Sequence, residues 1–311
     1  MRYHIDTAII KDKFSSGDNC PLCQIKSVIE EQLLYEYFNK EKKEGYKGVL
    51  SLYIHDESVE WQGEGRFRPA MLIFPGGGYA YCSDREAEPV ALTFLAKSFN
   101  AFVLDYTCAP TASYPTQLLE ASMAIAYIRE NASKLHILED KIAVMGFSAG
   151  GHLACSLSTL YEESVIKNYL GEKAKFVRPN LTVLGYPVIL TNGLTHEGTK
   201  NNISNFDEKV AEFLSLEKHV TKDCPSAFIW TTTNDDAVPS ENTLEIAYAY
   251  KRAGVSFELH MFEKGNHGLS VSNIETSGDI YPQCDNKLVN KWLELLDGFL
   301  DANGFCIPKR Y

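Results

Sequence analysis

The sequence lacks the features that mark several large classes of protein. Its first twenty residues contain no apolar run of the kind that forms a secretory signal. No stretch reaches the roughly 18 consecutive apolar residues that a membrane span needs. Internal repeats and low-complexity tracts are also missing. We therefore expect a cytoplasmic protein with no membrane partner.

Clustered basic residues are missing as well. The 311 residues include 30 Lys and Arg against 41 Asp and Glu, a formal net charge of −11. Proteins that bind nucleic acids need grouped cations that displace counterions from phosphates, so we expect no nucleic-acid partner. With 45% hydrophobic and 23% charged residues, the chain has the composition of an ordinary globular protein that can bury a substantial core.

The eight cysteines are scattered, and a reducing cytosol would keep most of them as buried thiols. The one close pair, Cys20 and Cys23, has the spacing of half a zinc site or of a redox pair. No second Cys-x-x-Cys or spaced histidine pair follows it, and no strand is evident before it, which favours two unligated thiols. The sequence thus predicts no metal and no organic cofactor.

Residues 1–44 differ in pattern from the rest of the chain. Apolar residues recur there at the three- and four-residue spacing of an amphipathic helix: Leu22, Ile25, Ile29 and Leu33. A charged run over residues 40–45 indicates the end of this helix and a linker. We predict an appended helical segment at residues 1–44 and a single larger domain at residues 45–311.

In the larger domain, short β-rich runs alternate with longer helical patterns, which is typical of βαβ units around a mainly parallel sheet. The expected strands are residues 49–54, 70–74, 101–106, 141–145, 181–185, 227–231 and 257–262. The last helix is expected to bury an apolar stripe of Leu288, Trp292, Leu295 and Phe299. Residues 186–226 are irregular apart from a helical stretch near 209–216, and such a long connection is usually functional, so we predict a small lid there.

The strongest motif is the Gly-x-Ser-x-Gly sequence Gly146-Phe147-Ser148-Ala149-Gly150, which directly follows a predicted strand and precedes a predicted helix. In this position it is typical of a nucleophile elbow. Such a turn is strained, exposes the serine hydroxyl and needs small residues two positions before and after the serine. A plain glycine-rich turn is the alternative. The context favours Ser148 as a nucleophile.

A second glycine loop, Pro75-Gly76-Gly77-Gly78-Tyr79, follows an earlier predicted strand. Acyl transfer places negative charge on the former carbonyl oxygen, and backbone N–H groups must already point at it. We assign this oxyanion hole to the N–H groups of Ala149 and Gly77, with Gly78 as the neighbouring candidate. A hinge or a phosphate-binding loop is the alternative, but the glycine spacings of nucleotide-binding motifs are absent.

A serine nucleophile needs a histidine to take its proton, and the histidine needs a carboxylate to hold its tautomer. His267 lies in a glycine-flanked loop after the last predicted strand, and Asp235 and Asp236 follow an earlier strand. The order Ser, Asp, His along the chain is that of the α/β-hydrolase fold. These residues alone leave both aspartates open as the partner of His267.

With these motifs, residues 46–311 resemble the α/β-hydrolase esterases related to hormone-sensitive lipase, and within them the bacterial acetyl esterase and acetylxylan-esterase-like group. The resemblance rests on residues 74–79, on Ser83-Asp84-Arg85-Glu86, on residues 146–152, on Asp235 four residues before Pro239, and on His267-Gly268. It implies an α/β-hydrolase fold with a mainly parallel sheet, helices on both faces and a small lid, and it favours Asp235. Residues 1–44 resemble the start of an uncharacterised bacterial family with a Cys-Pro-Leu-Cys motif.

The resulting hypothesis is a serine carboxylesterase that hydrolyses short-acyl esters, such as acetylated sugars or xylo-oligosaccharides, through an acyl-enzyme. Pro75 stands where related lipases carry a histidine, which favours a small polar ester over a lipid. Tyr79 and Arg85 are candidate substrate contacts, although an ion pair of Arg85 with Glu86 or Glu88 is at least as well supported. His152 is expected to be packed rather than catalytic.

Two other readings stay open. A peptidase could use the same three residues, and a non-catalytic binding module could keep the fold. The expected partner is a small-molecule ester, carbohydrate esters included, and a homodimer is the assembly left open.

Overall fold

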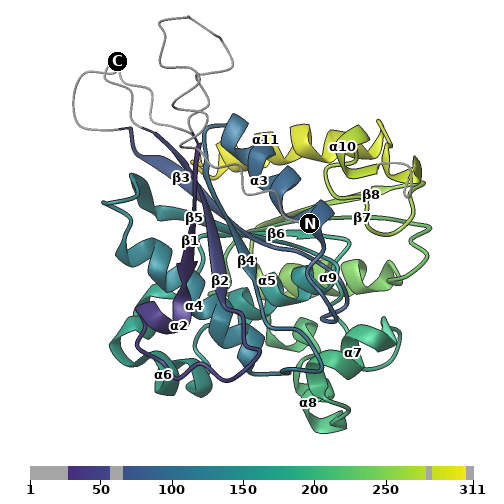
Figure 1. Ribbon diagram of the computed structural model, residues 1–311. Coiled ribbons are helices and arrows are strands. Elements are labelled where there is room, and N and C mark those ends of the chain that lie inside the picture. Colours follow the sequence, from purple (N-terminus) through teal and green to yellow (C-terminus); the bar gives the residue numbers. More distant parts are fainter. Residues whose placement is uncertain (1–26, 57–65, 278–281, 306–311) are drawn as a thin grey trace, which may run out of the picture.

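The computed structural model of the protein describes residues 27–56, 66–277 and 282–305. An eight-stranded sheet runs through them in the order β1-β2-β4-β3-β5-β6-β7-β8 (Figure 1). β1 pairs antiparallel with β2, β2 pairs antiparallel with β4, and the other neighbours are parallel. This confirms the prediction of a mainly parallel sheet.

The strands have clear bounds: β1 Ser27–Leu33, β2 Val49–His55, β3 Arg68–Phe74, β4 Asn100–Asp105, β5 Ile137–Phe147, β6 Leu181–Gly185, β7 Ala227–Thr232 and β8 Phe257–Phe262. All seven expected strands are present, and the largest difference is that β5 begins at Ile137 rather than at residue 141. The central strand β3 is buried at every residue. Strands covered on both faces become continuously apolar, which is why these runs could be read from the sequence.

Ten helices accompany the sheet in the described residues: α2 Leu34–Tyr37, α3 Glu88–Ala96, α4 Thr116–Glu130, α5 Ala149–Thr159, α6 Ser164–Leu170, α7 Glu197–Ser204, α8 Glu208–Phe213, α9 Glu241–Ala253, α10 Ile274–Ser277 and α11 Trp292–Ala302. Short 3₁₀ turns include η2 Asp84–Glu86, η4 Leu216–His219 and η6 Val289–Lys291. None of the helices in this part of the chain combines the length and the apolarity that crossing a bilayer requires.

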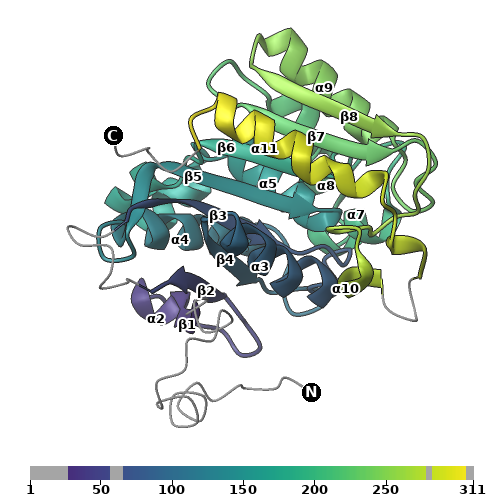
Figure 2. The same cartoon turned by 90° about the horizontal axis from the view of Figure 1, so that it is seen from above.

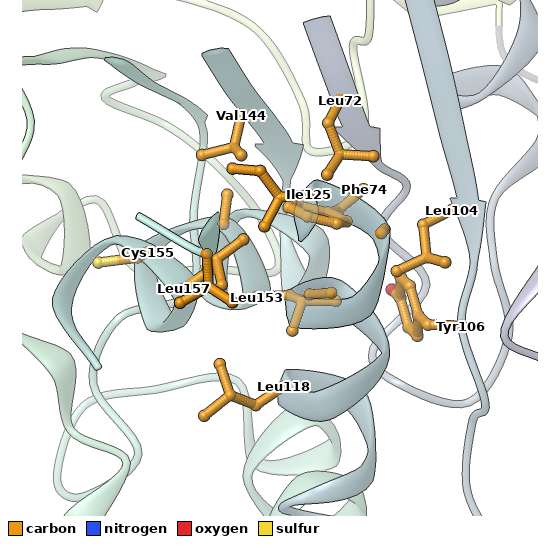
Figure 3. Packing of buried hydrophobic residues seen from close by; sticks show 14 of the residues in the cluster. Leu72, Phe74, Leu104, Tyr106, Leu118, Ile125, Val144, Leu153, Cys155 and Leu157 are labelled. Atoms are coloured by element: carbon orange, nitrogen blue, oxygen red, sulfur yellow. The ribbon is translucent and has the colours of Figure 1, made fainter. Parts of the chain in front are cut away.

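Two apolar layers hold the helices against the sheet, α3 and α11 on one face and α4, α5 and α9 on the other (Figure 2). Alternate side chains of β3 point to opposite layers: Leu72 and Phe74 face α4 and α5, whereas Met71 and Ile73 face α3 and α11. Figure 3 shows Leu72 and Phe74 packed with Leu153 of α5. This packing presses α5 onto the sheet and so determines the path of the turn between β5 and α5.

The expectation of a helix through residues 22–33 is wrong for Ser27–Leu33, which forms β1. All seven residues pair with β2, because an open sheet edge offers backbone partners that outweigh the weak helical period. The following Leu34 and Tyr35 are buried, and the Tyr35 hydroxyl donates to Glu120 of α4 at 2.7 Å. Residues 27–38 therefore pack against the sheet and α4, while residues 1–26 lie outside the described residues.

The prediction for Cys20 and Cys23 also falls outside the described residues. Five other cysteines are described, and all are free thiols. Four of them are buried, as expected, and they are Cys108, Cys155, Cys224 and Cys284.

The apolar stripe predicted for the last helix is partly wrong. Leu288 is 53% exposed and Leu295 is 36% exposed, whereas Leu296 and Leu300 are buried. The 3₁₀ turn η6 precedes α11, so the helix begins only at Trp292 and its phase is set from there. Its buried face accordingly follows the α-helical spacing of four, seven and eight residues from Trp292.

The irregular segment at residues 186–226 contains α7, α8 and η4, and α8 covers part of the expected helical stretch. α7 and α8 lie together beyond the strands, in the lower part of Figure 1. The first turns of both helices are capped locally, α7 by the His196 imidazole and α8 by the Asp207 carboxylate. That this segment acts as a lid stays a prediction.

Candidate active site

Ser148 occupies the turn between β5 and α5 with a positive φ of 54°. The close approach of strand and helix explains the glycines on either side of it. A Cβ on Gly146 would lie 1.9 Å from the Gly150 carbonyl oxygen, and a Cβ on Gly150 would lie 2.0 Å from the Phe74 carbonyl oxygen. Any side chain at these two positions would push the helix away from the sheet. The predicted elbow geometry is therefore present.

His267 reaches Ser148 across the edge of the sheet. Its Nε2 lies 2.7 Å from the Ser148 Oγ, and its Nδ1 lies 2.8 Å from the Asp235 Oδ2. Because a carboxylate only accepts hydrogen bonds, Nδ1 carries the proton and Nε2 is free to accept the serine hydroxyl. The carboxyl ends of the parallel strands β5, β7 and β8 thus bring together three residues that span 119 positions of the sequence.

The structure separates the two neighbouring aspartates. Asp235 is 1% exposed at its side chain, and its second oxygen accepts the backbone N–H groups of Ala237 and Val238 at 3.0 and 2.8 Å. Asp236 instead accepts the backbone N–H of His267 at 2.8 Å. Its other oxygen bonds the Asn266 amide at 3.1 Å. Only Asp235 faces the imidazole, whereas Asp236 holds the main chain of the same loop.

The glycine loop lies beside Ser148. Gly77 and Gly78 have φ values of 118° and 62°, and both line the same pocket as Ser148. The N–H of Gly76 is already used, since it donates to Glu86 at 2.7 Å. Ala149 opens α5, and the N–H groups of a first helical turn have no partner inside the helix. Gly77, Gly78 and Ala149 are therefore the donors that geometry leaves for an oxyanion.

Glu86 and Tyr186 were not predicted as functional residues, yet they connect the two loops of the site. Glu86 accepts the Gly76 N–H with one oxygen and the Tyr186 hydroxyl with the other, at 2.7 and 2.6 Å. The Tyr186 oxygen in turn accepts the backbone N–H of Ser270 at 2.8 Å. Burial, followed by the Glu86 carboxylate, raises the pKa of Tyr186, so the hydroxyl remains a donor.

Tyr186 also contacts the histidine directly. Its ring meets the His267 ring edge to face, with centroids 4.9 Å apart. The buried chain from Gly76 through Glu86 and Tyr186 to Ser270 thus supports both the glycine loop and the histidine loop. Its only signal in the sequence was the acidic residue of the Ser-Asp-Arg-Glu motif.

Arg85 lines the pocket, and its guanidinium also contacts the histidine loop, α10 and Cys284. Its guanidinium donates to the carbonyl oxygens of Gly268 and Thr276 at 2.8 and 3.1 Å. Among the described residues it forms no ion pair with Glu86 or Glu88, contrary to that alternative. A direct contact of Arg85 with substrate stays a prediction.

The prediction that Tyr79 contacts substrate is wrong in this structure. Its ring is fully buried, and its hydroxyl lies 2.9 Å from Nδ1 of His152. A large apolar ring gains more from the core beside Tyr106 than from the pocket surface. His152 is packed, as expected, with its Nε2 3.0 Å from the Leu214 carbonyl oxygen. Burial lowers the pKa of His152 to about 4, so it is neutral near pH 7.

The pocket that these loops enclose has a volume of about 380 Å³. Residues of the irregular segment line it as well, and the sequence had identified none of them individually. Its lining consists of Gly77, Gly78, Ala80, Tyr81, Ser83, Arg85, Glu86, Ser148, His196, Gly198, Asn202, Ala237, His267 and Gly268. Within residues 27–56, 66–277 and 282–305, no three side chains of His, Cys, Asp or Glu are grouped so as to hold a metal ion.

Comparison with known proteins finds a matching family and several similar proteins. The family model described as BD-FAE matches residues 60–249. Endo-1,4-beta-xylanase B of Butyrivibrio fibrisolvens is 36% identical over 261 residues, which are 82% of this chain and 40% of that protein. An acetylxylan esterase of Xylanibacter ruminicola is 29% identical over 216 residues, 64% of this chain and 40% of that protein. The chain thus spans about two fifths of the length of these curated relatives.

Solved structures agree in fold. An acetyl ester-xyloside bifunctional hydrolase from Caldicellulosiruptor lactoaceticus has 35% identity and a TM-score of 0.72, with 83% of this chain and 89% of that chain covered. A carboxylesterase from Lactobacillus plantarum has 27% identity and a TM-score of 0.77, with 91% of this chain and 100% of that chain covered. The predicted α/β-hydrolase fold is confirmed.

Proposed function

Because the chain belongs to the BD-FAE family of α/β hydrolases, we propose that it is a serine carboxylesterase that hydrolyses short-acyl esters, with acetylated sugars such as xylo-oligosaccharides as substrates. One observation carries this proposal: the hydrogen-bonded series Ser148, His267 and Asp235 opens into a pocket bordered by the glycine loop. The names of the relatives, an acetylxylan esterase and an acetyl ester-xyloside bifunctional hydrolase among them, support the substrate class.

In the proposed reaction, Ser148 Oγ attacks the ester carbonyl carbon while Nε2 of His267 takes the hydroxyl proton. The carbonyl oxygen becomes negatively charged and accepts hydrogen bonds from the N–H groups of Ala149 and Gly77, with Gly78 as the neighbouring donor. The alcohol leaves with the proton from His267, and an acetyl group remains on Ser148. A water molecule then repeats the attack, and the acid is released.

Asp235 has two functions in this scheme. It keeps the proton of the neutral imidazole on Nδ1, and it stabilises the imidazolium that forms when the serine proton arrives. Two backbone N–H groups hold the carboxylate in this position, so its orientation does not depend on the histidine. The site is therefore preorganised before substrate binds.

The pocket lining supports a small polar ester. Its one large side chain with mainly apolar surface is Tyr81, and no Val, Leu, Ile, Met or Phe of the described chain lines it. A long acyl chain would find few apolar side chains there and would forgo much of the gain of about 0.8 kcal/mol for each methylene that is buried. Acetyl, by contrast, needs room for one methyl group.

An ester panel tests the proposal. p-Nitrophenyl esters from acetate to octanoate and acetylated xylose should be cleaved by the wild type, with acetate preferred. Ser148→Ala should lower kcat by about 10⁵-fold or more. Ser133→Ala, an exposed serine outside the pocket, is the matched control and should behave as the wild type. Full hydrolysis of p-nitrophenyl acetate by Ser148→Ala would refute the assignment.

Two further measurements separate the rival readings. Peptide p-nitroanilides should be cleaved far more slowly than acetate esters, and the opposite order would indicate a peptidase. A fluorophosphonate probe should label the wild type but not Ser148→Ala. A wild type that resists labelling would point to a binding protein with the fold of a hydrolase.

A further inference from the structure

Two side chains, Tyr81 and His196, lie against consecutive glycines of the glycine loop. The proposed chemistry uses neither of them. The Tyr81 ring is so close to Gly77 that its Cδ2 would lie 3.1 Å from a Cβ built there. The His196 imidazole is adjacent to Gly78, with its Cε1 3.6 Å from a Cβ built on that residue. Both side chains line the pocket. They therefore border the place where the ester carbonyl would bind.

His196 is held in a defined position by the helix that it caps. Its Nδ1 accepts the backbone N–H of Thr199 at 3.2 Å and lies 2.9 Å from the Thr199 hydroxyl. α7 itself is attached to the glycine loop, because Asn202 donates to the Gly78 carbonyl oxygen at 2.8 Å. The imidazole is thus placed relative to the oxyanion hole from both ends of α7.

The same contacts define the tautomer of His196. Since Nδ1 uses its lone pair to accept the Thr199 N–H, the proton of the neutral ring must be on Nε2. Burial and the neighbouring His267 lower the pKa of His196, so the ring is neutral near pH 7. Within the described part of the chain, Nε2 has no acceptor. It is a donor available to a ligand in the pocket.

Tyr81 offers a different kind of surface. Its side chain is 62% exposed although it borders the pocket, so it lies at the mouth. A sugar ring has apolar C–H faces and a rim of hydroxyl groups. An exposed aromatic ring can pack on such a face, while a neutral N–H can donate to a hydroxyl.

We propose that Tyr81 and His196 form a carbohydrate subsite for the alcohol part of the ester, in which Tyr81 packs on the sugar ring and His196 Nε2 donates to a sugar hydroxyl. This inference rests on the proposed esterase function. The acetyl group occupies little of the pocket, so the side chains at its open mouth meet the alcohol part. Tyr81 and His196 are then specificity-determining residues, and the acyl-transfer step itself does not require them.

The test compares two acetate esters that differ only in the alcohol. One is an acetylated xylo-oligosaccharide, and the other is ethyl acetate, whose alcohol has no ring and no hydroxyl after esterification. The variants are Tyr81→Ala and His196→Ser. Serine is a good N-cap, so it keeps the cap of α7 but is too short to donate in the pocket. Acid release at constant pH reports both reactions.

Each variant should lower kcat/KM for the sugar ester about three- to tenfold, mainly through KM, and leave ethyl acetate nearly unchanged. Tyr248→Ala and His219→Ser are the matched controls, because neither residue lines the pocket. Both should keep the ratio of the two rates. Unchanged thermal midpoints would show that the variants are folded.

Three results would overturn the inference. If both esters slow equally in a variant, the residue supports the fold or the chemistry and not the sugar. If neither ester slows, the residues do not contact the alcohol part. If the wild type hydrolyses neither ester, the proposed function fails together with the subsite, and this outcome is distinguishable because it appears before any substitution is made.

Discussion

Replacing Asp235 with asparagine should slow acyl transfer although the side chain keeps its size and shape. The reason is the distribution of donors around it. One carboxylate oxygen accepts two backbone N–H groups, from Ala237 and Val238, and the other faces Nδ1 of His267. The side chain of asparagine has a single oxygen, which can face either the two backbone N–H groups or Nδ1 of His267, but not both.

The favoured orientation places the asparagine oxygen on the two backbone donors. Its NH₂ group then points at Nδ1 of His267 and can only donate, so Nδ1 must accept and the ring proton moves to Nε2. That nitrogen lies 2.7 Å from the Ser148 Oγ. An N–H in this place cannot take the serine proton, and the nucleophile is not activated.

The opposite orientation restores the useful tautomer but leaves both backbone N–H groups facing an NH₂ group. The Val238 donor is partly buried and costs about 1–3 kcal/mol when it is unpaired, whereas the exposed Ala237 donor can turn to water, so this state lies about 1–3 kcal/mol higher. At about 1.4 kcal/mol per factor of ten, kcat should fall by about 5-fold to 150-fold.

Asp236→Asn is the matched control, one residue away in the same loop. Its remaining oxygen still accepts the His267 N–H, and only the exposed contact with the Asn266 amide is lost. That change corresponds to about 1 kcal/mol, or about fivefold at most. Initial rates of p-nitrophenyl acetate hydrolysis with equal amounts of folded protein measure both variants. Equal losses in the two, or a larger loss for Asp236→Asn, would refute this account of the loop.

Two further predictions concern buried polar groups. Glu86→Gln should lower kcat by about 10- to 100-fold with little change in KM. The reason is that the one oxygen of an amide cannot accept from both Gly76 and Tyr186, so the glycine loop shifts. Unchanged steady-state kinetics would contradict this role. The free energy of unfolding should fall by about 3 kcal/mol between pH 7 and pH 4 through His152 alone. Burial lowers the pKa of His152 in the folded protein from 6.5 to about 4, so in that range mainly the unfolded chain binds the proton. Urea titrations of wild type and His152→Gln should show this part of the pH dependence in the wild type only.

The strands and the loops that carry the motifs could be predicted because their signals are local. β6 and β8 have the bounds that their apolar runs predicted. The elbow around Ser148 could be identified for the same reason, since glycines two positions away are a steric requirement of the turn itself. The Ser, Asp, His order then followed from the alternation of strands and loops.

Other features depended on contacts between distant segments. β1 is a strand because the edge of β2 was available to it, and its own spacing favoured a helix. Tyr79 points inward because its ring packs against Tyr106 and its hydroxyl lies within hydrogen-bond distance of His152. No local pattern contains that information, since the partners lie 27 and 73 residues away.

The sequence by itself determined where the backbone turns and which residue types stand at those turns, because chain stiffness, glycine freedom and apolar periodicity act over a few residues. The tertiary structure decided which of two adjacent carboxylates meets His267, a choice that the motifs without the family resemblance had left open. It alone decided that Glu86 joins two loops. It also decided that His196 reaches the pocket. Which side chains meet depends on how separate elements pack. That packing is stabilised by contacts throughout the core and not by any local stretch of sequence.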